Sequence, residues 1–126
     1  MPAKRGTQQE RIATMSLRFL GKGGSDRNGC PSLFAKDNSY VVAGWRTGRP
    51  ETVEIPHLLT GFAEPDTFIG AMMTDTGRGT FTLTGRPITD SETLVELDLA
   101  DDETAIETPK SERTFYGATA ARRPLA

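Results

Sequence analysis

The chain has 126 residues, 36% of them hydrophobic and 7% aromatic, so it builds at most one domain with a modest core. Thirteen glycines and eight prolines predict short elements and many turns, which favours strands over long helices. The sequence has no apolar run of about 18 residues, and neither a membrane span nor a signal peptide is expected. A single cysteine excludes an internal disulfide and makes the cytoplasm the expected compartment.

The net charge of -2 is unevenly distributed along the chain. Residues 1–29 carry +4 and residues 109–126 carry +3, whereas residues 30–108 hold five basic and fourteen acidic residues and carry -9. Charged surfaces usually serve solubility alone. They can also attract a partner of opposite charge, so an acidic body between basic ends predicts a basic protein partner.

The first half of the chain predicts a tail followed by four short strands. Residues 1–14 are polar and basic, and we expect them to be flexible. Leu17 and Phe19 then alternate with Arg18, which is typical of a half-buried strand. The most strand-like stretch is rich in aromatic and β-branched residues. The four predicted strands lie at residues 16–20, 32–35, 40–45 and 52–55, with a glycine-rich loop at residues 21–29.

The second half combines strands with short helical segments. Pro56 is followed by a short helical or irregular turn that Gly61 would end. Residues 67–74 and 80–84 flank a glycine-containing turn, which is typical of a β-hairpin. Strict alternation in the second of these runs places the side chain of Leu83, like that of Phe81, inward.

After Ile88 the sequence fits a short helix that opens with a capping box. The Thr89 hydroxyl and the Glu92 carboxylate, three residues apart, can accept hydrogen bonds from the free N–H groups of a first turn. Leu97 or Asp98 would end this helix. The residues between also alternate between apolar and polar, so a strand is the alternative.

These elements predict a β-dominated α+β fold. We expect mainly an antiparallel sheet, or a partly closed barrel, built from hairpins with one or two short helices. The folded domain is predicted at residues 15–108, with residues 104–108 as its final strand. Flexible basic tails are expected at residues 1–14 and 109–126.

The two halves of the chain show a weak internal duplication. Residues 40–44 match residues 81–85, and residues 53–56 match residues 106–109. A true duplication would give a pseudo-symmetric sheet. Chance similarity between half-buried hairpins explains the match equally well.

Neither of the side chains best suited to nucleophilic or acid–base chemistry has the context of a catalytic site. His57 is the only histidine and lies in an apolar stretch with no nucleophile motif nearby. Cys30 precedes Pro31, which removes a backbone N–H that would stabilise a thiolate, and a small buried thiol is the expected role. We therefore expect no catalytic residue and no enzyme activity.

The sequence also predicts no metal or cofactor site. One cysteine and one histidine cannot form a structural zinc site. The carboxylates of Asp98, Asp101, Asp102 and Glu103 lack EF-hand spacing, so we expect a solvated acidic loop. The glycine-rich residues 21–25 lack the spacing of a phosphate-binding loop.

Protein binding is better supported than nucleic-acid binding. The acidic middle of the chain and a pI near 5.4 disfavour DNA binding by the folded part, and the basic tails would touch phosphates only weakly and without specificity. Phe115 and Tyr116 place two aromatic side chains in a basic C-terminal segment. Such a pattern can anchor a short linear motif in a partner's groove.

Several segments carry a family resemblance. They are residues 19–22 (FLGK), 28–34 (NGCPSLF), 40–45 (YVVAGW), 53–56 (VEIP) and 76–81 (TGRGTF). The chain resembles, from Phe19 to Pro109, a family of small uncharacterised actinobacterial proteins whose genes often stand near helix-turn-helix regulators. The resemblance implies a small regulatory or accessory protein rather than an enzyme. It supplies no catalytic or binding residues.

We expect a non-enzymatic interaction protein that acts through an acidic surface on a protein partner, such as a basic DNA-binding regulator. One alternative is a small-molecule-binding domain with a pocket lined by Tyr40, Trp45, Phe68 and Phe81, although core packing is the simpler role for these rings. Another is self-assembly through an edge strand, as a homodimer or larger. The candidate partner-binding residues are Trp45, Asp90, Glu92, Glu96, Asp98, Asp101, Asp102, Glu103, Phe115 and Tyr116.

Overall fold

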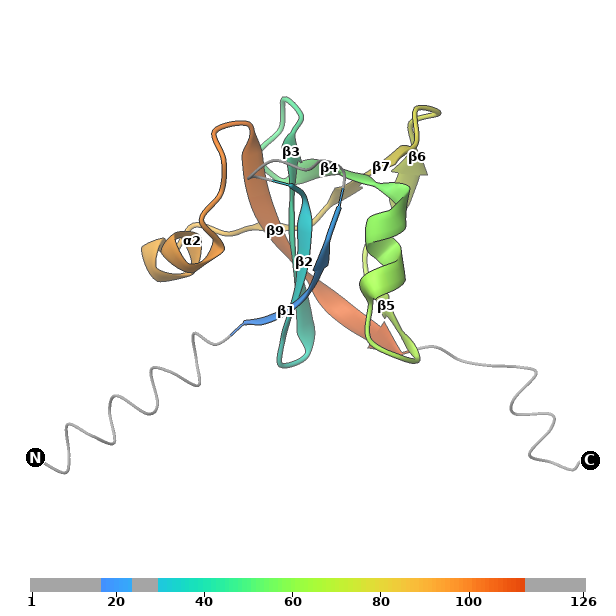
Figure 1. Ribbon diagram of the computed structural model, residues 1–126, viewed down its shortest axis with the longest axis horizontal. Helices are drawn as coiled ribbons and strands as arrows, with labels where there is room; N and C mark the ends of the chain where they lie inside the picture. Colours follow the sequence, from blue (N-terminus) through green and yellow to red (C-terminus); the bar gives the residue numbers. More distant parts are fainter. Residues whose placement is uncertain (1–16, 24–29, 113–126) are drawn as a thin grey trace, which may run out of the picture.

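Strand β3 (Ser39–Arg46) runs through the centre of the molecule and organises the sheet (Figure 1). The structure is a computed structural model that describes residues 17–23 and 30–112. All five residues from Tyr40 to Gly44 are buried, because protein packs on both faces of the strand. β-Branched and aromatic side chains favour extended backbone in such a position, and the strand predicted here is confirmed.

Both edges of β3 are paired with antiparallel strands. Along one edge β3 pairs with β9 (Glu103–Glu112), from Ser39 opposite Pro109 to Trp45 opposite Glu103. Along the other edge β3 pairs first with β2 (Ser32–Lys36) and then, at its end, with β4 (Thr52–Pro56). The hairpin of β3 and β4 therefore opens after two residue pairs, and β2 fills the space beside β3.

The remaining strands extend the sheet from β2, β4 and β9, the three neighbours of β3. β1 pairs with β2, β7 and β6 follow β4, and both β5 and β8 pair with β9. The sheet has nine strands and does not close, so the β-dominated α+β class is confirmed in its open antiparallel form. Two short helices, η1 and α2, complete the fold. Their bounds and those of the outer strands are β1 (Arg18–Lys22), η1 (His57–Phe62), β5 (Thr67–Ile69), β6 (Met73–Asp75), β7 (Thr80–Thr84), β8 (Arg86–Pro87) and α2 (Ser91–Leu97).

The two faces of β3 pack against different layers. Tyr40 and Val42 belong to an inner cluster that is shared with β4, β7 and η1. Val41 and Ala43 belong to an outer cluster, to which α2 contributes Leu97. This division follows from the two-residue period of a strand. Burying each aliphatic or aromatic side chain of this kind stabilises the fold by about 1.5–3 kcal/mol.

Helix α2 begins and ends at an aspartate. Asp90 is the N-cap, and its carboxylate accepts hydrogen bonds from the Thr93 backbone N–H at 3.0 Å and from the Thr93 hydroxyl at 2.5 Å. Asp98 closes the helix in the left-handed conformation, with φ of 53°. The predicted helix is confirmed, but the cap lies one residue after Thr89. Glu92 is an exposed first-turn residue whose charge favours the helix N-terminus.

Neither helix is long and apolar enough to cross a membrane, as judged over residues 17–23 and 30–112. η1, a 3-10 helix, forms where the sequence predicts a helical turn after Pro56.

The segment at residues 67–74, predicted as one strand, is divided into two. β6 pairs with β7 as the predicted hairpin requires, but β5 pairs with β9. Between them the Gly70 N–H donates to the Pro109 carbonyl oxygen at 2.8 Å, and the Ala71 N–H donates to Ile69 at 2.9 Å. A Cβ at position 70 would lie 2.6 Å from the Pro109 oxygen, so this close approach requires glycine.

The first strand also differs from its prediction. Phe19, expected to face inward with Leu17, is 57% exposed. Alternation is kept, because Leu17 and Phe19 lie on the outer side of the sheet and Leu20 packs against the inner cluster. Phe19 is exposed because the outer side is only partly covered at this point, where its ring contacts Phe34 at the wall of a pocket. The register of β1 against β2 shifts only after Phe19, between Phe19 and Gly21.

The last strand reaches Glu112, beyond the boundary predicted at residue 108. Lys110 secures this extension, because its backbone N–H donates to the Asn38 carbonyl oxygen at 2.8 Å. The weak duplication matched residues 81–85 and 106–109 in the second half of the chain, which lie mainly in β7 and β9. These two strands do not pair with each other among the described residues. Residues 1–14, Phe115 and Tyr116 lie outside the described residues.

Gly44 lets β3 and β4 approach closely, and its replacement tests this packing. A Cβ at position 44 would lie 2.7 Å from the Glu54 carbonyl oxygen, so Gly44→Ala should lower the free energy of unfolding by about 1–3 kcal/mol in urea titrations. The control is Gly48→Ala, where a Cβ meets nothing within 4 Å and the change should stay within about 0.5 kcal/mol. Equal effects of the two substitutions would contradict this account of β3.

Candidate functional site

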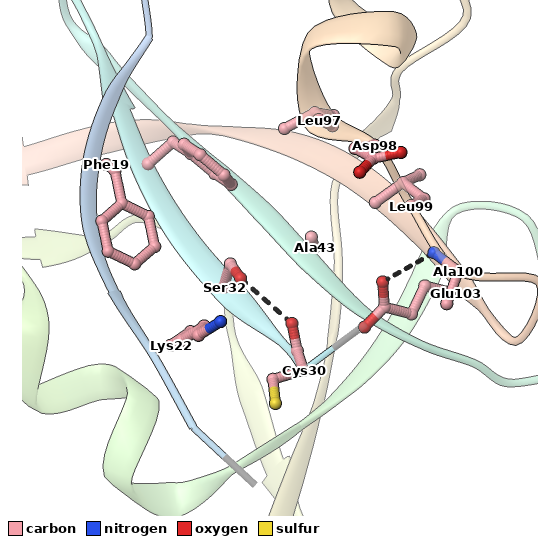
Figure 2. Close-up of a pocket in the computed structure, with 11 residues that line it drawn as sticks. Phe19, Lys22, Cys30, Ser32, Ala43, Leu97, Asp98, Leu99, Ala100 and Glu103 are labelled. Carbon is pink, nitrogen blue, oxygen red and sulfur yellow. Dashed lines mark hydrogen bonds between the residues drawn. The ribbon is translucent and has the colours of Figure 1, made fainter. Parts of the chain in front are cut away.

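A pocket of about 540 Å³ opens on the outer face of the sheet, between β1, β2 and the connection from α2 to β9 (Figure 2). Its apolar walls include the rings of Phe19 and Phe34, whose centroids lie 5.7 Å apart in an edge-to-face arrangement. Leu97 and Leu99 line the side that belongs to α2 and the following connection. The pocket therefore lies beside the outer cluster, where α2 stops covering the sheet.

Glu103 is the most deeply buried charged residue of this pocket. It is the first residue of β9 and is only 2% exposed. Its Oε1 atom accepts a hydrogen bond from the Ala100 backbone N–H at 3.1 Å, and its own N–H donates to the Ala100 carbonyl oxygen at 3.0 Å. Figure 2 shows the carboxyl group directed toward Cys30 on the opposite wall. The tight turn before β9 thus holds the side chain in one orientation.

The second carboxyl oxygen of Glu103 lacks a hydrogen bond. Oε2 is buried and has no hydrogen-bond partner among the described residues. Burial raises the pKa of Glu103 above its usual range; the Ala100 N–H acts in the opposite direction, and the charge of Asp102 raises the pKa further. A buried carboxylate with one unsatisfied oxygen is unfavourable for stability. The pocket therefore presents an acceptor that favours a cationic or proton-donating group.

Six exposed carboxylates surround the helix α2 and the connection to β9. None of them takes part in an ion pair with another described residue. Two have local hydrogen bonds: Asp90 caps α2, and Glu96 accepts from the Leu17 backbone N–H at 3.3 Å. We call this set the acidic face. Its members are Asp90, Glu92, Glu96, Asp98, Asp101 and Asp102.

Several carboxylates elsewhere in the molecule have cationic partners, whereas Asp37, Asp66 and Glu112 form no ion pair among the described residues. Glu64 binds Lys110 at 2.7 Å and also pairs with Arg18, and hydrogen bonds from these two cations, Lys110 first, lower its pKa. Glu107 likewise pairs with Arg86 at 2.5 Å. From Pro87 to Pro109 the chain has no lysine or arginine. The acidic face therefore forms no side-chain ion pair among the described residues, although Arg46 and Lys36 lie near Asp101 and Asp90.

Trp45 and Glu103 lie opposite each other where β3 and β9 pair. Residues directly opposite in an antiparallel pair point to the same face. Trp45 is half-buried, and Ala43, two residues earlier, lines the pocket. The structure thus places Trp45 beside Glu103, and the role of these two residues in partner binding stays a prediction.

The prediction that Glu103 is one of four solvated carboxylates is wrong, because its side chain is buried. Asp98, Asp101 and Asp102 are exposed, whereas Glu103 enters the sheet. No group of three or more His, Cys, Asp or Glu side chains suited to a metal occurs within residues 17–23 and 30–112. The cluster therefore divides into an exposed rim and one buried acceptor.

The aromatic pocket considered from the sequence is wrong in its composition. Tyr40 is fully buried, and its hydroxyl accepts from the Glu64 backbone N–H at 2.7 Å. Phe81 packs against the inner cluster, and Phe68 is 45% exposed. The pocket is instead lined by Phe19 and Phe34, which the sequence did not single out for binding. The sequence indicated only that these two aromatic residues lie on neighbouring short strands, predicted at residues 16–20 and 32–35.

His57 has structural contacts rather than a nucleophile beside it. Its Nε2 atom lies 3.3 Å from the Asp75 carboxylate and 3.2 Å from the Thr80 carbonyl oxygen. Its ring packs on Phe81 with centroids 4.3 Å apart. Cys30 belongs to the pocket instead, where its carbonyl oxygen accepts from the Ser32 hydroxyl at 3.0 Å.

Comparisons with known proteins do not place the chain in a family. No protein-family model, no curated protein and no solved structure matches it. The resemblance to small actinobacterial proteins, with the regulatory role that it implies, stays a prediction based on the quoted segments.

The buried carboxyl of Glu103 predicts a specific pH dependence of stability. Because burial raises its pKa above the ordinary 4.5, the folded state holds this proton more tightly than the unfolded chain does. The stability that Glu103 contributes is complete below about pH 4.5 and is lost as the pH rises through the raised pKa. Glu103→Gln cannot lose this proton, so its free energy of unfolding should exceed that of the wild type at pH 7.

Urea titrations between pH 4 and pH 8 measure this effect. The advantage of Glu103→Gln over the wild type should grow across the range as Glu103 ionises in the wild type. Glu112→Gln, at an exposed position on the same strand, is the control and should leave the pH dependence unchanged. A difference between Glu103→Gln and the wild type that stays constant with pH would contradict the prediction.

Proposed function

We propose that the protein is a non-enzymatic, cytoplasmic binding protein that holds a basic segment of a protein partner on its acidic face. The observation that carries this proposal is the contrast between carboxylates. Those of the acidic face have no ion pair among the described residues, whereas Glu64 and Glu107 are each paired with nearby cations. Two cations lie near the acidic face, because the Arg46 Nε atom donates to the Asp101 carbonyl oxygen at 3.1 Å and the charge of Lys36 acts on Asp90. The six carboxylates outnumber these two cations, and such an excess of one sign attracts a basic partner and aligns it during encounter.

The surroundings of the acidic face suit a protein partner. Val95, on the exposed side of α2, is 79% exposed, and Phe19 at the pocket mouth is 57% exposed. Apolar groups between charges supply the contact area that charge alone does not. DNA-binding regulators expose lysine and arginine, so a regulator of this kind has the required chemistry. The basic residues of such a partner would approach the acidic face through long-range attraction.

Neutralising part of the acidic face tests the proposal. The variant Glu92→Gln, Asp101→Asn, Asp102→Asn removes three charges and leaves the Asp90 cap in place. The probe is a short basic peptide, GKSKRKSKG, with both ends blocked. Its affinity should fall about fivefold to tenfold at low salt, because each exposed ion pair contributes about 0.2–1 kcal/mol, and the loss should shrink at high salt. Isothermal titration calorimetry measures both.

The matched control removes three exposed charges elsewhere: Asp37→Asn, Asp66→Asn, Glu112→Gln. Asparagine tolerates the positive φ of Asp37 and Asp66, so the fold should be kept. If this control weakened the peptide as much as the test variant, net charge and not the acidic face would explain binding. A pull-down from native lysate with the same pair of variants would then extend the comparison to natural partners.

A further inference from the structure

Glu103 differs from every member of the acidic face. The exposed carboxylates can remain hydrated, but Glu103 is 2% exposed and its Oε2 atom has no hydrogen-bond partner among the described residues. Its Oε1 atom is already engaged by the Ala100 N–H at 3.1 Å. The side chain is therefore held in place with one unpaired acceptor, Oε2, which is buried at the pocket wall (Figure 2).

We propose that this pocket receives an arginine side chain of the bound partner, whose guanidinium donates to Glu103. The inference rests on the proposed function and adds which residue of the basic segment is recognised and where it lies. An arginine in the pocket would satisfy the unpaired Oε2 atom once the atoms that cover it move aside, while flanking basic residues of the same segment meet the acidic face. One interaction would then supply specificity and the others attraction.

The walls of the pocket favour guanidinium over other cations. Phe19 and Phe34 offer aromatic surface on which a planar guanidinium stacks, and Leu97 and Leu99 offer apolar surface for the arginine methylenes. A guanidinium is also more weakly hydrated than a lysine ammonium, so it enters a partly closed pocket at lower cost. A divalent metal ion would need several oxygen ligands, and the described residues offer no such group.

The charges around the pocket are compatible with this occupant. Asp98 lines the mouth and adds a second carboxylate, and Asp102 adds its charge close to Glu103. Lys22 of β1 also lines the pocket, but it forms no ion pair with Glu103. A volume of about 540 Å³ accommodates one long side chain together with the segment that carries it. The negative groups therefore outnumber the one cation of the wall.

The test compares two peptides on the chain of 126 residues. One is GKSKRKSKG, and the other carries citrulline, a neutral analogue of arginine, at the central position. The wild type should prefer the arginine peptide by about tenfold, the order expected for a hydrogen bond to a charged group. Glu103→Gln should reduce this preference to near one while still binding both peptides in a salt-sensitive manner. Thermal unfolding of each variant confirms that it is folded.

A second variant keeps the test independent of Glu103. Phe19→Leu replaces an exposed ring at the pocket wall and should lower the arginine preference severalfold with little change in stability. An unchanged preference in both variants would overturn the pocket inference. Salt-sensitive binding that still requires the acidic face would, in that case, leave the proposed function intact. Absence of any salt-sensitive binding would overturn both.

Other sources of the guanidinium give different results. If free agmatine bound as tightly as the arginine peptide, the pocket would serve a small molecule, and docking of a partner segment would be wrong. Light scattering of the same chain of 126 residues tests for self-association. Self-association that Glu103→Gln abolishes would place a second copy in the pocket and would also overturn the proposal.

Discussion

Burial of β3 on both faces is the constraint on which the rest of the structure depends. Five successive residues of this strand, Tyr40 to Gly44, are buried, so each face needs its own apolar cover. The inner face is covered by β4, β7 and η1, which requires β4 to leave β3 after two pairs and cross its face. Gly44 makes that crossing possible, since a Cβ at this position would lie only 2.7 Å from the Glu54 carbonyl oxygen.

The outer face receives a smaller cover, and the candidate site is a consequence of this. Helix α2 has only seven residues and contributes one buried leucine, Leu97, to the outer cluster. The sheet beside it is covered by the Phe19 and Phe34 rings only in part, and the pocket opens between these two covers. Glu103 lies at this boundary because β9 must begin there to pair with Trp45.

Local patterns predicted most of the elements. The strands at residues 40–45 and 52–55 and the short helix after Ile88 follow from β-branched content, two-residue alternation and capping chemistry, which act within a few residues. The division of residues 67–74 could not be predicted in this way, because it depends on contact between Gly70 and Pro109. Long-range register, not composition, decides such cases.

The same limit applies to the site. The acidic stretch is visible in the sequence as a run without lysine or arginine, and its exposed members follow from composition alone. Nothing local distinguishes Glu103 from Asp101 and Asp102, however. Its burial is set by the pairing of β9 with β3, and its orientation is set by the turn at Ala100. The residue that carries the specific chemistry was therefore predicted only as part of a group.

The buried carboxyl of Glu103 lowers the stability of the free protein but would strengthen the binding of a cationic partner. An unsatisfied buried carboxyl lowers stability, and six further carboxylates without ion pairs lie around it. A core glutamine or an apolar residue would fit position 103 at lower cost to the fold. A bound cation changes this balance, because the same carboxyl then gains a partner in a site that excludes much of the solvent. The feature that weakens the free protein is thus the one that would contribute most to a complex.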